Sequence, residues 1–285
     1  MTARLIKGDE VAEEVRAEIS SELKDLYDGT GYVAGLAVIV VGENPTSLAY
    51  ISNCVKQSEK LGINTWVHRL DAGISHEELL ELIKELNDDF LVHGIMIQMP
   101  LPDHLDHRAI VETIDPEKDV EGVHPITMGK LFSDEKGFIP CTAHSIMKMV
   151  EYTRQPVYGK SAVIIGRSNI VGKPLSLLLL RRNASITVCH TQTVGLPDIC
   201  READIVVAAA GSPYLVEGSW IKEDAMVIDV GVTQLEDKMV GDVNFQECSE
   251  VAGWISPVPG GVGPLTITML MWNTLEAFRK KMDRI

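Results

Sequence analysis

The chain has 285 residues, of which 45% are hydrophobic and 24% are charged, so it can bury the cores of two medium-sized domains. Its 41 Asp and Glu residues outnumber its 26 Lys and Arg residues, and the formal net charge of -15 argues against nucleic acid or an anionic membrane as a general partner. An anionic ligand must therefore meet a locally basic site.

The cysteines bear on the compartment and on metal binding. They are odd in number, lack the paired spacing of a metal site and lie in a chain too long to need a disulfide framework. The five are Cys54, Cys141, Cys189, Cys200 and Cys248. We expect a reducing, cytoplasmic setting and no bound metal. The sequence shows no signal peptide and no stretch near the roughly 18 apolar residues of a membrane span, which predicts a soluble protein without a membrane partner.

The first part of the chain alternates between helical and strand-like patterns. The predicted elements are helix 11–26, strand 35–41, helix 47–62, strand 63–70, a helix that opens at 75 with the capping box Ser75-x-x-Glu78, and strand 94–99. This alternation predicts a parallel α/β sheet with right-handed crossovers, in which ligands gather at the carboxyl ends of the strands. Tyr50, Gln98 and Glu121 follow or finish such strands.

A second alternation begins after Pro140. Its predicted elements are strand 161–165, helix 172–182 and strands 185–189, 204–209 and 225–230. We therefore expect an α/β protein with a first domain over residues 1–140, completed by the last helix at 265–285, and a separate Rossmann-like domain over 141–264. A ligand cleft is expected between them.

Strand 161–165 leads directly into Gly166-Arg-Ser-Asn-Ile-Val-Gly-Lys-Pro174 and a leucine-rich helix, the order that a phosphate-binding turn requires. The pattern is not G-x-G-x-x-G, so a purely structural turn is the alternative. An NAD site commonly carries an acid about 20 residues further on, where this chain has Cys189-His190-Thr191. Arg167 suits a 2′-phosphate, which favours NADP over NAD, although a surface arginine is the alternative.

The segment Pro257-Val-Pro-Gly-Gly-Val-Gly-Pro264 combines stiff and permissive residues before a helical pattern over 265–281. The prolines restrict the backbone, and the glycines allow tight turns and a close approach to a flat ligand. We interpret it as a binding loop; the alternative is a plain turn into the helix.

These segments together resemble a known family. The motifs are Val41-Gly-Glu-Asn-Pro-Thr-Ser47 with Tyr50, Gln98-Met-Pro-Leu-Pro102, Asp115-Pro-Glu-Lys-Asp-Val-Glu-Gly-Val-His-Pro125, and the segments 166–174 and 257–264. In this order they resemble the methylenetetrahydrofolate dehydrogenase/cyclohydrolase family over nearly the whole chain. The resemblance implies a homodimer with a folate-binding domain and an NADP-binding domain, which oxidises 5,10-methylene-tetrahydrofolate to the 5,10-methenyl form and then hydrates it to 10-formyl-tetrahydrofolate.

The resemblance also implies roles for individual residues. In the family's pattern Tyr50 stacks beside the folate and Gln98 hydrogen-bonds in the catalytic centre. The implied catalytic positions are Tyr50, Cys54, Gln98 and Glu121. The implied substrate-binding residues are Tyr50, Gln98, Pro100, Leu101, Glu121, Pro259, Gly260 and Gly261. The implied cofactor-binding residues are Gly166, Arg167, Ser168, Thr191 and Val232. For Tyr50 a core tyrosine, and for Gln98 a loop-capping glutamine, are the alternatives.

Two positions depart from the family's pattern. The family has a catalytic lysine four residues after the tyrosine, whereas this chain has Cys54, and a thiol with an ordinary pKa near 8.5 is largely neutral at pH 7. Lys56 lies about 200° around the helix from Cys54 and is a poor substitute. The second departure is Glu121, where the family's Lys-Asp-Val-Asp-Gly motif has an aspartate.

The two departures set the functional alternatives. Hydration gains most from a lysine that polarises the attacked centre, so we expect an NADP-dependent dehydrogenase with a weakened or lost cyclohydrolase activity. A fully bifunctional enzyme is the first alternative. The second is a catalytically silent folate- or nucleotide-binding protein, which an assay of NADPH formation would separate from the other two.

Overall fold

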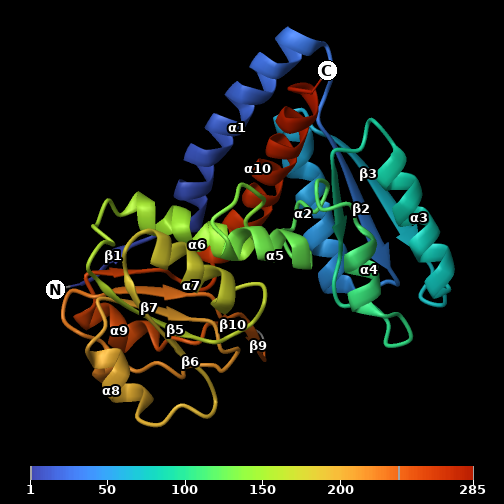
Figure 1. Ribbon diagram of the computed structural model, residues 1–285. Coiled ribbons are helices and arrows are strands. Elements are labelled where there is room, and N and C mark those ends of the chain that lie inside the picture. The colour runs from blue at the N-terminus through green and yellow to red at the C-terminus, as the bar shows by residue number, and fades with distance from the viewer. Residues whose placement is uncertain (1, 237, 285) are drawn as a thin grey trace. The chain divides into compact units, whose positions relative to one another are not determined.

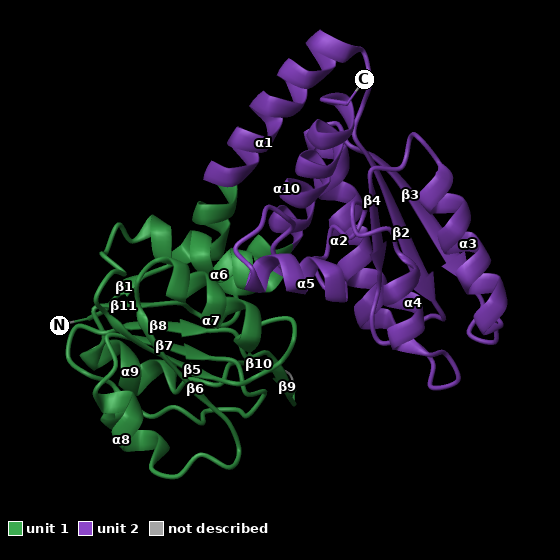
Figure 2. Ribbon diagram, viewed as in Figure 1, with its two compact units in different colours: residues 1–13, 142–266 green, residues 14–141, 267–285 purple. Residues whose placement is uncertain are grey.

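A computed structural model describes residues 2–236 and 238–284 of the protein (Figure 1). The chain forms two compact units, shown in Figure 2. Unit 1 comprises residues 1–13 and 142–266, and unit 2 comprises residues 14–141 and 267–285. Two helices, α1 (Gly8–Thr30) and α10 (Val262–Met282), pass from one unit to the other. Within the described ranges, no helix has the length and apolar character needed to span a membrane.

Unit 2 is built on a parallel three-stranded sheet with the order β3-β2-β4. The strands are β2 (Gly35–Val41), β3 (Asn64–Leu70) and β4 (Gly94–Ile97). Every residue of the central strand β2 is buried, as its unbroken apolar sequence predicts for a strand covered on both faces. Of the three strands of this sheet, the one that comes first in the sequence, β2, therefore lies between the other two. This places a switch in strand order between β2 and β4, where open α/β sheets bind their ligands.

Unit 2 contains four further helices besides its parts of α1 and α10. They are α2 (Pro45–Leu61), α3 (His76–Asp88), α4 (His107–Thr113) and α5 (Pro125–Phe132). The apolar sides of α3 and α4 pack with Ala37, Ile39 and Ile97 in one core cluster. The helix ends follow the local sequence: α2 stops at Gly62 with φ 76°, and both bonds of the predicted capping box at Ser75 and Glu78 are present.

Unit 1 contains a parallel six-stranded sheet among the described residues, with the order β1-β11-β8-β7-β5-β6. The strands are β1 (Arg4–Leu5), β5 (Ser161–Ile165), β6 (Ser185–Cys189), β7 (Ile205–Ala208), β8 (Met226–Asp229) and β11 (Trp254–Ile255). Strand β6 lies on one side of β5 and β7 on the other, so the strand order switches between β5 and β7.

The start of the chain differs from the predicted domain boundary. Residues 1–13 were expected in the first domain, but β1 pairs in parallel with β11, and Ile6 donates a further backbone bond to Ile255 at 2.9 Å. This pairing attaches them to unit 1. A two-residue strand has no periodicity for sequence analysis to detect.

The remaining elements of unit 1 are short. They are α6 (Cys141–Tyr152), α7 (Gly172–Arg181), α8 (Leu196–Arg201), the 3-10 helix η1 (Gly218–Trp220), α9 (Phe245–Val251) and the antiparallel hairpin β9 (Thr233–Leu235) and β10 (Lys238–Val240). The last helix, α10, begins at Val262 and not at 265 as predicted. Pro264 therefore lies in its first turn, where a missing N–H leaves no helical bond unmade.

Candidate active site and cofactor site

The carboxyl end of the sheet in unit 2 carries two of the predicted site residues. Gln98 directly follows β4, and its backbone N–H donates to the Ile39 carbonyl at 2.9 Å. The Glu121 carboxylate accepts a bond from the backbone N–H of Ile97 at 3.3 Å. Glu121 and Gln98 therefore lie together at the switch between β2 and β4.

Asp119 holds the segment that carries Glu121, and sequence analysis gave it no role. Its buried carboxylate accepts bonds from the backbone N–H groups of Gly122, Val123 and His124 and from the Thr127 hydroxyl, at 2.7 to 3.2 Å. These four bonds fix the turn around Glu121. Sequence analysis offers only one signal for this role, a carboxylate placed at the start of a tight Gly-containing turn.

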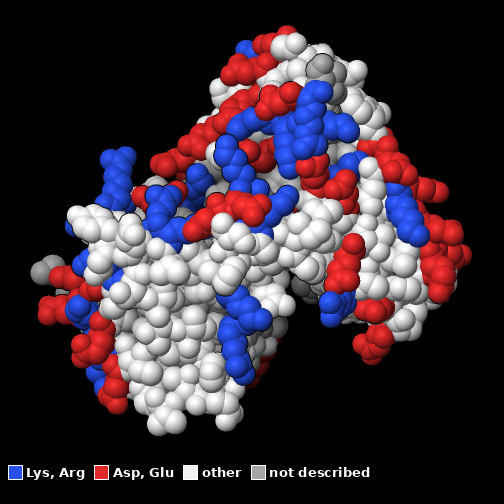
Figure 3. Space-filling view, in the orientation of Figure 1, with Lys and Arg blue, Asp and Glu red and all other residues white. Residues whose placement is uncertain are grey.

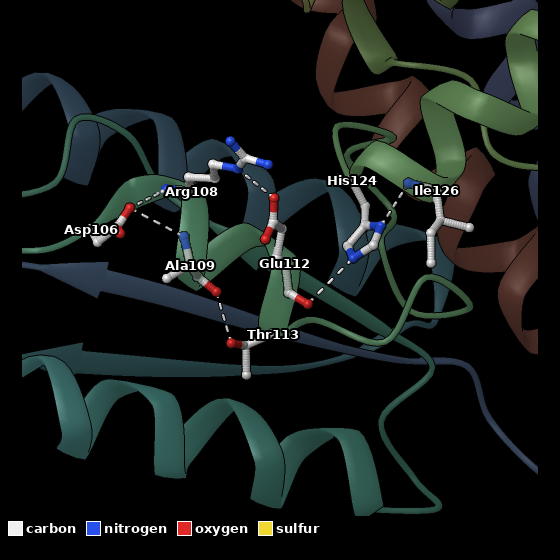
Figure 4. A network of polar contacts seen from close by, with 7 residues as sticks. All are labelled: Asp106, Arg108, Ala109, Glu112, Thr113, His124 and Ile126. Carbon is white, nitrogen blue, oxygen red and sulfur yellow. Dashed lines mark hydrogen bonds and ion pairs between the residues drawn. The ribbon is translucent and has the colours of Figure 1, made fainter.

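A second network, drawn in Figure 4, ties the same segment to α4. The backbone N–H of Ile126 donates to His124 Nδ1 at 3.0 Å, so the proton of the neutral ring lies on Nε2, which contacts the Glu112 carbonyl at 3.4 Å. At the other end of α4, Asp106 accepts bonds from the N–H groups of Arg108 and Ala109. The segment that follows Glu121 is thus held against the C-terminal end of α4 through His124.

The residues of α2 divide between a buried and an exposed face. Cys54 belongs to the buried stripe of α2 and is 0% exposed, whereas Lys56 is exposed and Tyr50 is half-buried. Burial, and next the negative charge of Glu121, raise the pKa of the Cys54 thiol to about 12. Cys54 is therefore a neutral thiol close to Glu121.

Glu121 is the unusual acid of this site. Burial, and then the neighbouring Asp119, raise its pKa to about 8, and the bond from Ile97 opposes this shift. Its side chain keeps limited solvent contact. At neutral pH the carboxyl is mostly protonated, so it can donate a hydrogen bond as well as accept one.

The side-chain amide of Gln98 has a hydrogen-bond partner for its nitrogen but none for its oxygen among the described residues. Its nitrogen donates to the Met99 carbonyl at 2.6 Å, whereas its buried oxygen has no partner among residues 2–236 and 238–284. A buried acceptor without a donor is costly and points to a group that binds there. Of the two residues after Met99, Pro100 is exposed and Leu101 is buried.

In unit 1 the glycine turn lies at the switch between β5 and β7. Gly166 has φ 128°, and a Cβ atom there would lie 2.2 Å from the Ala209 carbonyl oxygen at the end of β7. A Cβ atom on Gly172 would lie 2.1 Å from the Gly166 carbonyl oxygen. The turn therefore requires both glycines. Helix α7 begins without a side-chain cap. The Lys173 N–H donates to the Ser168 carbonyl at 3.1 Å and Pro174 has no N–H, so in the first turn the Gly172 N–H is the group that could face an anion.

The other predicted cofactor residues are exposed around the ends of the strands in unit 1. Arg167 and Ser168 are in the turn after β5, and Thr191 is two residues after β6. The Ser168 hydroxyl accepts a bond from the Val171 N–H at 3.1 Å, which shapes the turn. Val232 is 52% exposed, three residues after β8. These positions offer a hydroxyl, a guanidinium and an apolar side chain to a ligand.

Two buried aspartates, not expected from the sequence, fix the loop that carries Val232. Asp229 accepts bonds from the backbone N–H groups of Gly231, Asp242 and Val243, and Asp242 accepts bonds from those of residues 210–212. Burial is the first cause that raises the pKa of Asp229, to about 7, and Asp242 adds to it. The pair joins the ends of β7 and β8.

The proline- and glycine-rich segment forms a tight turn in unit 1. Gly260 has φ 99°, and a Cβ atom on Gly261 would lie 2.5 Å from the Pro257 carbonyl oxygen. The Gly260 carbonyl accepts a bond from the Gly8 N–H at 2.8 Å. Gly260 and Gly261 thus serve the turn itself, and Pro259 is at its tip.

Comparison with known proteins identifies the family. The sequence model of the tetrahydrofolate dehydrogenase/cyclohydrolase catalytic domain matches residues 6–121, and that of the family's NAD(P)-binding domain matches residues 140–282. The chain belongs to the tetrahydrofolate dehydrogenase/cyclohydrolase family. The family expected from five sequence motifs is therefore confirmed, as is its architecture of two α/β domains with parallel sheets.

Relatives of this family cover the chain from end to end. The Bifunctional protein FolD of Moorella thermoacetica is 49% identical over 98% of this chain and 100% of its own length. The bifunctional FolD structure from Campylobacter jejuni has a TM-score of 0.95 at 42% identity and covers 99% of this chain and 100% of its own. The Trypanosoma brucei FolD, solved with NADP cofactor and inhibitor, has a TM-score of 0.94 at 37% identity over 98% of both chains.

Each unit gathers one set of the predicted residues. Unit 2 brings Cys54, Gln98 and Glu121 to one end of its sheet, with Tyr50 one helical turn before Cys54. Unit 1 carries the glycine turn, Thr191, Val232 and the 257–261 segment. No cluster of three or more His, Cys, Asp or Glu side chains within the described ranges could hold a metal ion.

Proposed function

We propose that the protein oxidises 5,10-methylene-tetrahydrofolate to 5,10-methenyl-tetrahydrofolate with NADP. The observation that carries the proposal is the family match over both domains, together with the tight glycine turn at the switch between β5 and β7, where open α/β sheets bind their ligands. Bound NADP would supply the acceptor for the hydride that leaves the methylene carbon.

The residues of unit 1 fit that cofactor. The backbone N–H groups of the turn and of Gly172 at the start of α7 suit a pyrophosphate, and both glycines keep the turn tight because a side chain there would strike its own backbone. We propose that Gly166, Arg167, Ser168, Thr191 and Val232 hold the cofactor. Arg167 would pair with the 2′-phosphate, and NADP is also the cofactor named for the Trypanosoma brucei relative.

The residues of unit 2 would orient the folate. We propose that the Tyr50 ring stacks on the pterin and that the unpaired Gln98 oxygen accepts one of its N–H bonds. Glu121, largely protonated at pH 7, would hold a proton next to the reacting centre. Pro100, Leu101, Pro259, Gly260 and Gly261 would contact the substrate and exclude water.

The hydration step has two competing proposals. Full bifunctionality is supported by the relatives, which are named bifunctional proteins at 46–49% identity, and this support is stronger than that for a loss. A weakened hydration is supported by this chain's own residues, because Cys54 is a buried neutral thiol and Lys56 points to solvent. The names of the relatives cover both activities, whereas Cys54 offers no ammonium, the group that the family resemblance implies for hydration.

One assay tests these proposals. 5,10-Methylene-tetrahydrofolate and NADP are mixed with the protein, and NADPH and the methenyl product are followed at separate wavelengths. NADPH formation establishes the dehydrogenase, and its absence would support the silent binding protein. Decay of the methenyl product faster than without protein establishes the cyclohydrolase. Decay at the uncatalysed rate would support a protein that has lost the cyclohydrolase activity.

We also propose a homodimer in the cytoplasm. The thiols favour a reducing compartment, since all five cysteines are free and four of them are buried. The dimer rests on the family resemblance. Light scattering coupled to size-exclusion chromatography would measure a mass near twice the 31.3 kDa of one chain if the protein is a dimer.

A further inference from the structure

A pocket in unit 2 lies at the opposite end of the sheet from Gln98. It has a volume of about 80 Å³ and is lined by residues before β4, by residues before Asp119, and by α10 and Arg284 just after it. His93, directly before β4, contributes to its wall, as do Lys118, Lys280, Lys281 and Arg284. Such a volume holds several waters or one small anion. The proposed folate and cofactor residues are not among those that line it.

His93, which lines this pocket, carries a ring donor without a partner among the described residues. Its Nδ1 accepts the Gly35 backbone N–H at 2.9 Å, so the proton of the neutral ring must lie on Nε2. The ring is 3% exposed, packs edge-on against Phe278 at 4.8 Å, and Nε2 has no partner among the described residues. Burial, and next Lys118, lower the pKa of His93 to about 4, which keeps the ring neutral. A buried N–H without an acceptor is costly.

Two ammonium groups beside His93 lack a carboxylate partner in the contacts of the described residues. Glu117 is engaged by Lys280 and Arg284, each with a contact at 2.8 Å. Lys118 instead donates to the carbonyl oxygens of Leu86 and Asp89, and Lys281 lies 5.2 Å from the centre of the Phe90 ring.

The charge around the pocket is positive although the chain is acidic. Its lining includes four basic side chains and two acidic ones, Asp115 and Glu117. Burial, and then repulsion by Lys281, lower the pKa of Lys118, an effect that Asp115, Asp89 and Asp88 oppose. Figure 3 shows basic side chains gathered near the C-terminal end of α10. A bound anion would relieve the repulsion between the two lysines.

We propose that this pocket, formed by His93, Lys118 and Lys281, binds one small oxyanion group, a phosphate or a carboxylate. The His93 Nε2–H and the two ammonium groups supply the donors, and oxygen acceptors on one compact anion satisfy all three. This places an anion site in unit 2, separate from the proposed folate and cofactor residues.

The test uses the purified full-length protein without NADP. Isothermal titration with inorganic phosphate, and separately with acetate, is compared for the wild type, Lys281→Gln and Lys281→Glu. Lys281 is on the surface of α10, so these variants keep the fold, which circular dichroism verifies. Phosphate or acetate is expected to bind saturably, about tenfold more weakly to Lys281→Gln and undetectably to Lys281→Glu.

Lys84→Gln is the matched control, because Lys84 is an exposed lysine of α3 in the same unit and does not line the pocket. It should bind as the wild type does. A crystal soaked in phosphate should show the anion within hydrogen-bonding distance of His93 Nε2. The proposal is overturned if neither probe binds, or if Lys281→Gln binds both as tightly as the wild type.

Discussion

The carboxyl group of Glu121 makes the free energy of unfolding depend on pH. Because its pKa is raised from 4.5 to about 8 in the folded protein, the folded state binds more protons than the unfolded state between these values. Ionised Glu121 therefore destabilises the fold increasingly as pH rises from about 4.5 to 8. Gln at this position keeps an acceptor oxygen for the Ile97 N–H without the charge.

Glu121→Gln should accordingly melt at the wild-type temperature near pH 4.5 and higher than the wild type by roughly 3 °C near pH 8.5. Differential scanning calorimetry at the two pH values measures this, and other titrating groups cancel because both proteins contain them. Glu59→Gln, on the exposed face of α2, should show no such pH-dependent difference. An equal shift at both pH values would show that Glu121 is not the group that titrates.

The side chain at position 54 should control hydration. Cys54→Lys places an ammonium beside Glu121, and that carboxylate compensates the buried charge. We expect methenyl hydrolysis to rise by about 10² or more, since positioned acid–base groups contribute roughly 10²–10⁴. Stopped-flow absorbance measures it. Lys56→Gln is the control, because Lys56 is exposed and its replacement should leave hydrolysis unchanged. A loss of hydrolysis in Lys56→Gln would instead show that Lys56 serves the site.

Arg167 should set the choice between the two nicotinamide cofactors. Arg167→Ala removes the guanidinium proposed for the 2′-phosphate, so the KM for NADP should rise about tenfold while that for NAD stays unchanged. NAD is the internal control, since it lacks that phosphate. Steady-state kinetics with both cofactors decide the matter, and a parallel rise for the two would assign Arg167 to the turn and not to the phosphate.

At the scale of elements, the glycine turn between β5 and α7 has no room for a side chain. Gly172→Ala brings a Cβ atom against the Gly166 carbonyl and must displace the turn. We expect NADP to bind at least tenfold more weakly by isothermal titration. Gly29→Ala in α1 meets no atom within 4 Å and should leave NADP binding unchanged. Wild-type affinity in Gly172→Ala would remove the turn from the cofactor site.

The elements also show which features of the fold the sequence could predict. Long periodic segments such as β2, α2 and α3 fall close to their expected bounds, because their burial follows directly from apolar spacing. Short elements with no periodicity, such as β1 and the β9–β10 hairpin, were missed. Strand order was not expected either, since pairing between distant segments leaves no local trace.

For the candidate site, the sequence predicted the residues that lie in motifs but not the residues that hold them in place. Motif residues such as Gln98 and Gly166 were identified from the sequence because their chemistry and position after strands are visible there. Asp119, Asp229 and Asp242 were not, although each accepts several backbone bonds. A carboxylate that orders backbone N–H groups from distant residues looks, in sequence, like any surface acid. The raised pKa of Glu121 likewise depends on burial that only the fold provides.

At the scale of the whole molecule, the formal charge of -15 opposes the compact state through self-repulsion. Salt screens this repulsion, because the Debye length falls from about 30 Å at 0.01 M to about 8 Å at 0.15 M. Raising NaCl over this range at neutral pH should therefore increase the melting temperature by a few degrees, equivalent to about 1 kcal/mol. Near the sequence pI of 4.9 the net charge vanishes, and the same salt step should have little effect. Calorimetry at both pH values tests this, and equal shifts would show that salt acts through hydration of apolar surface and not through charge.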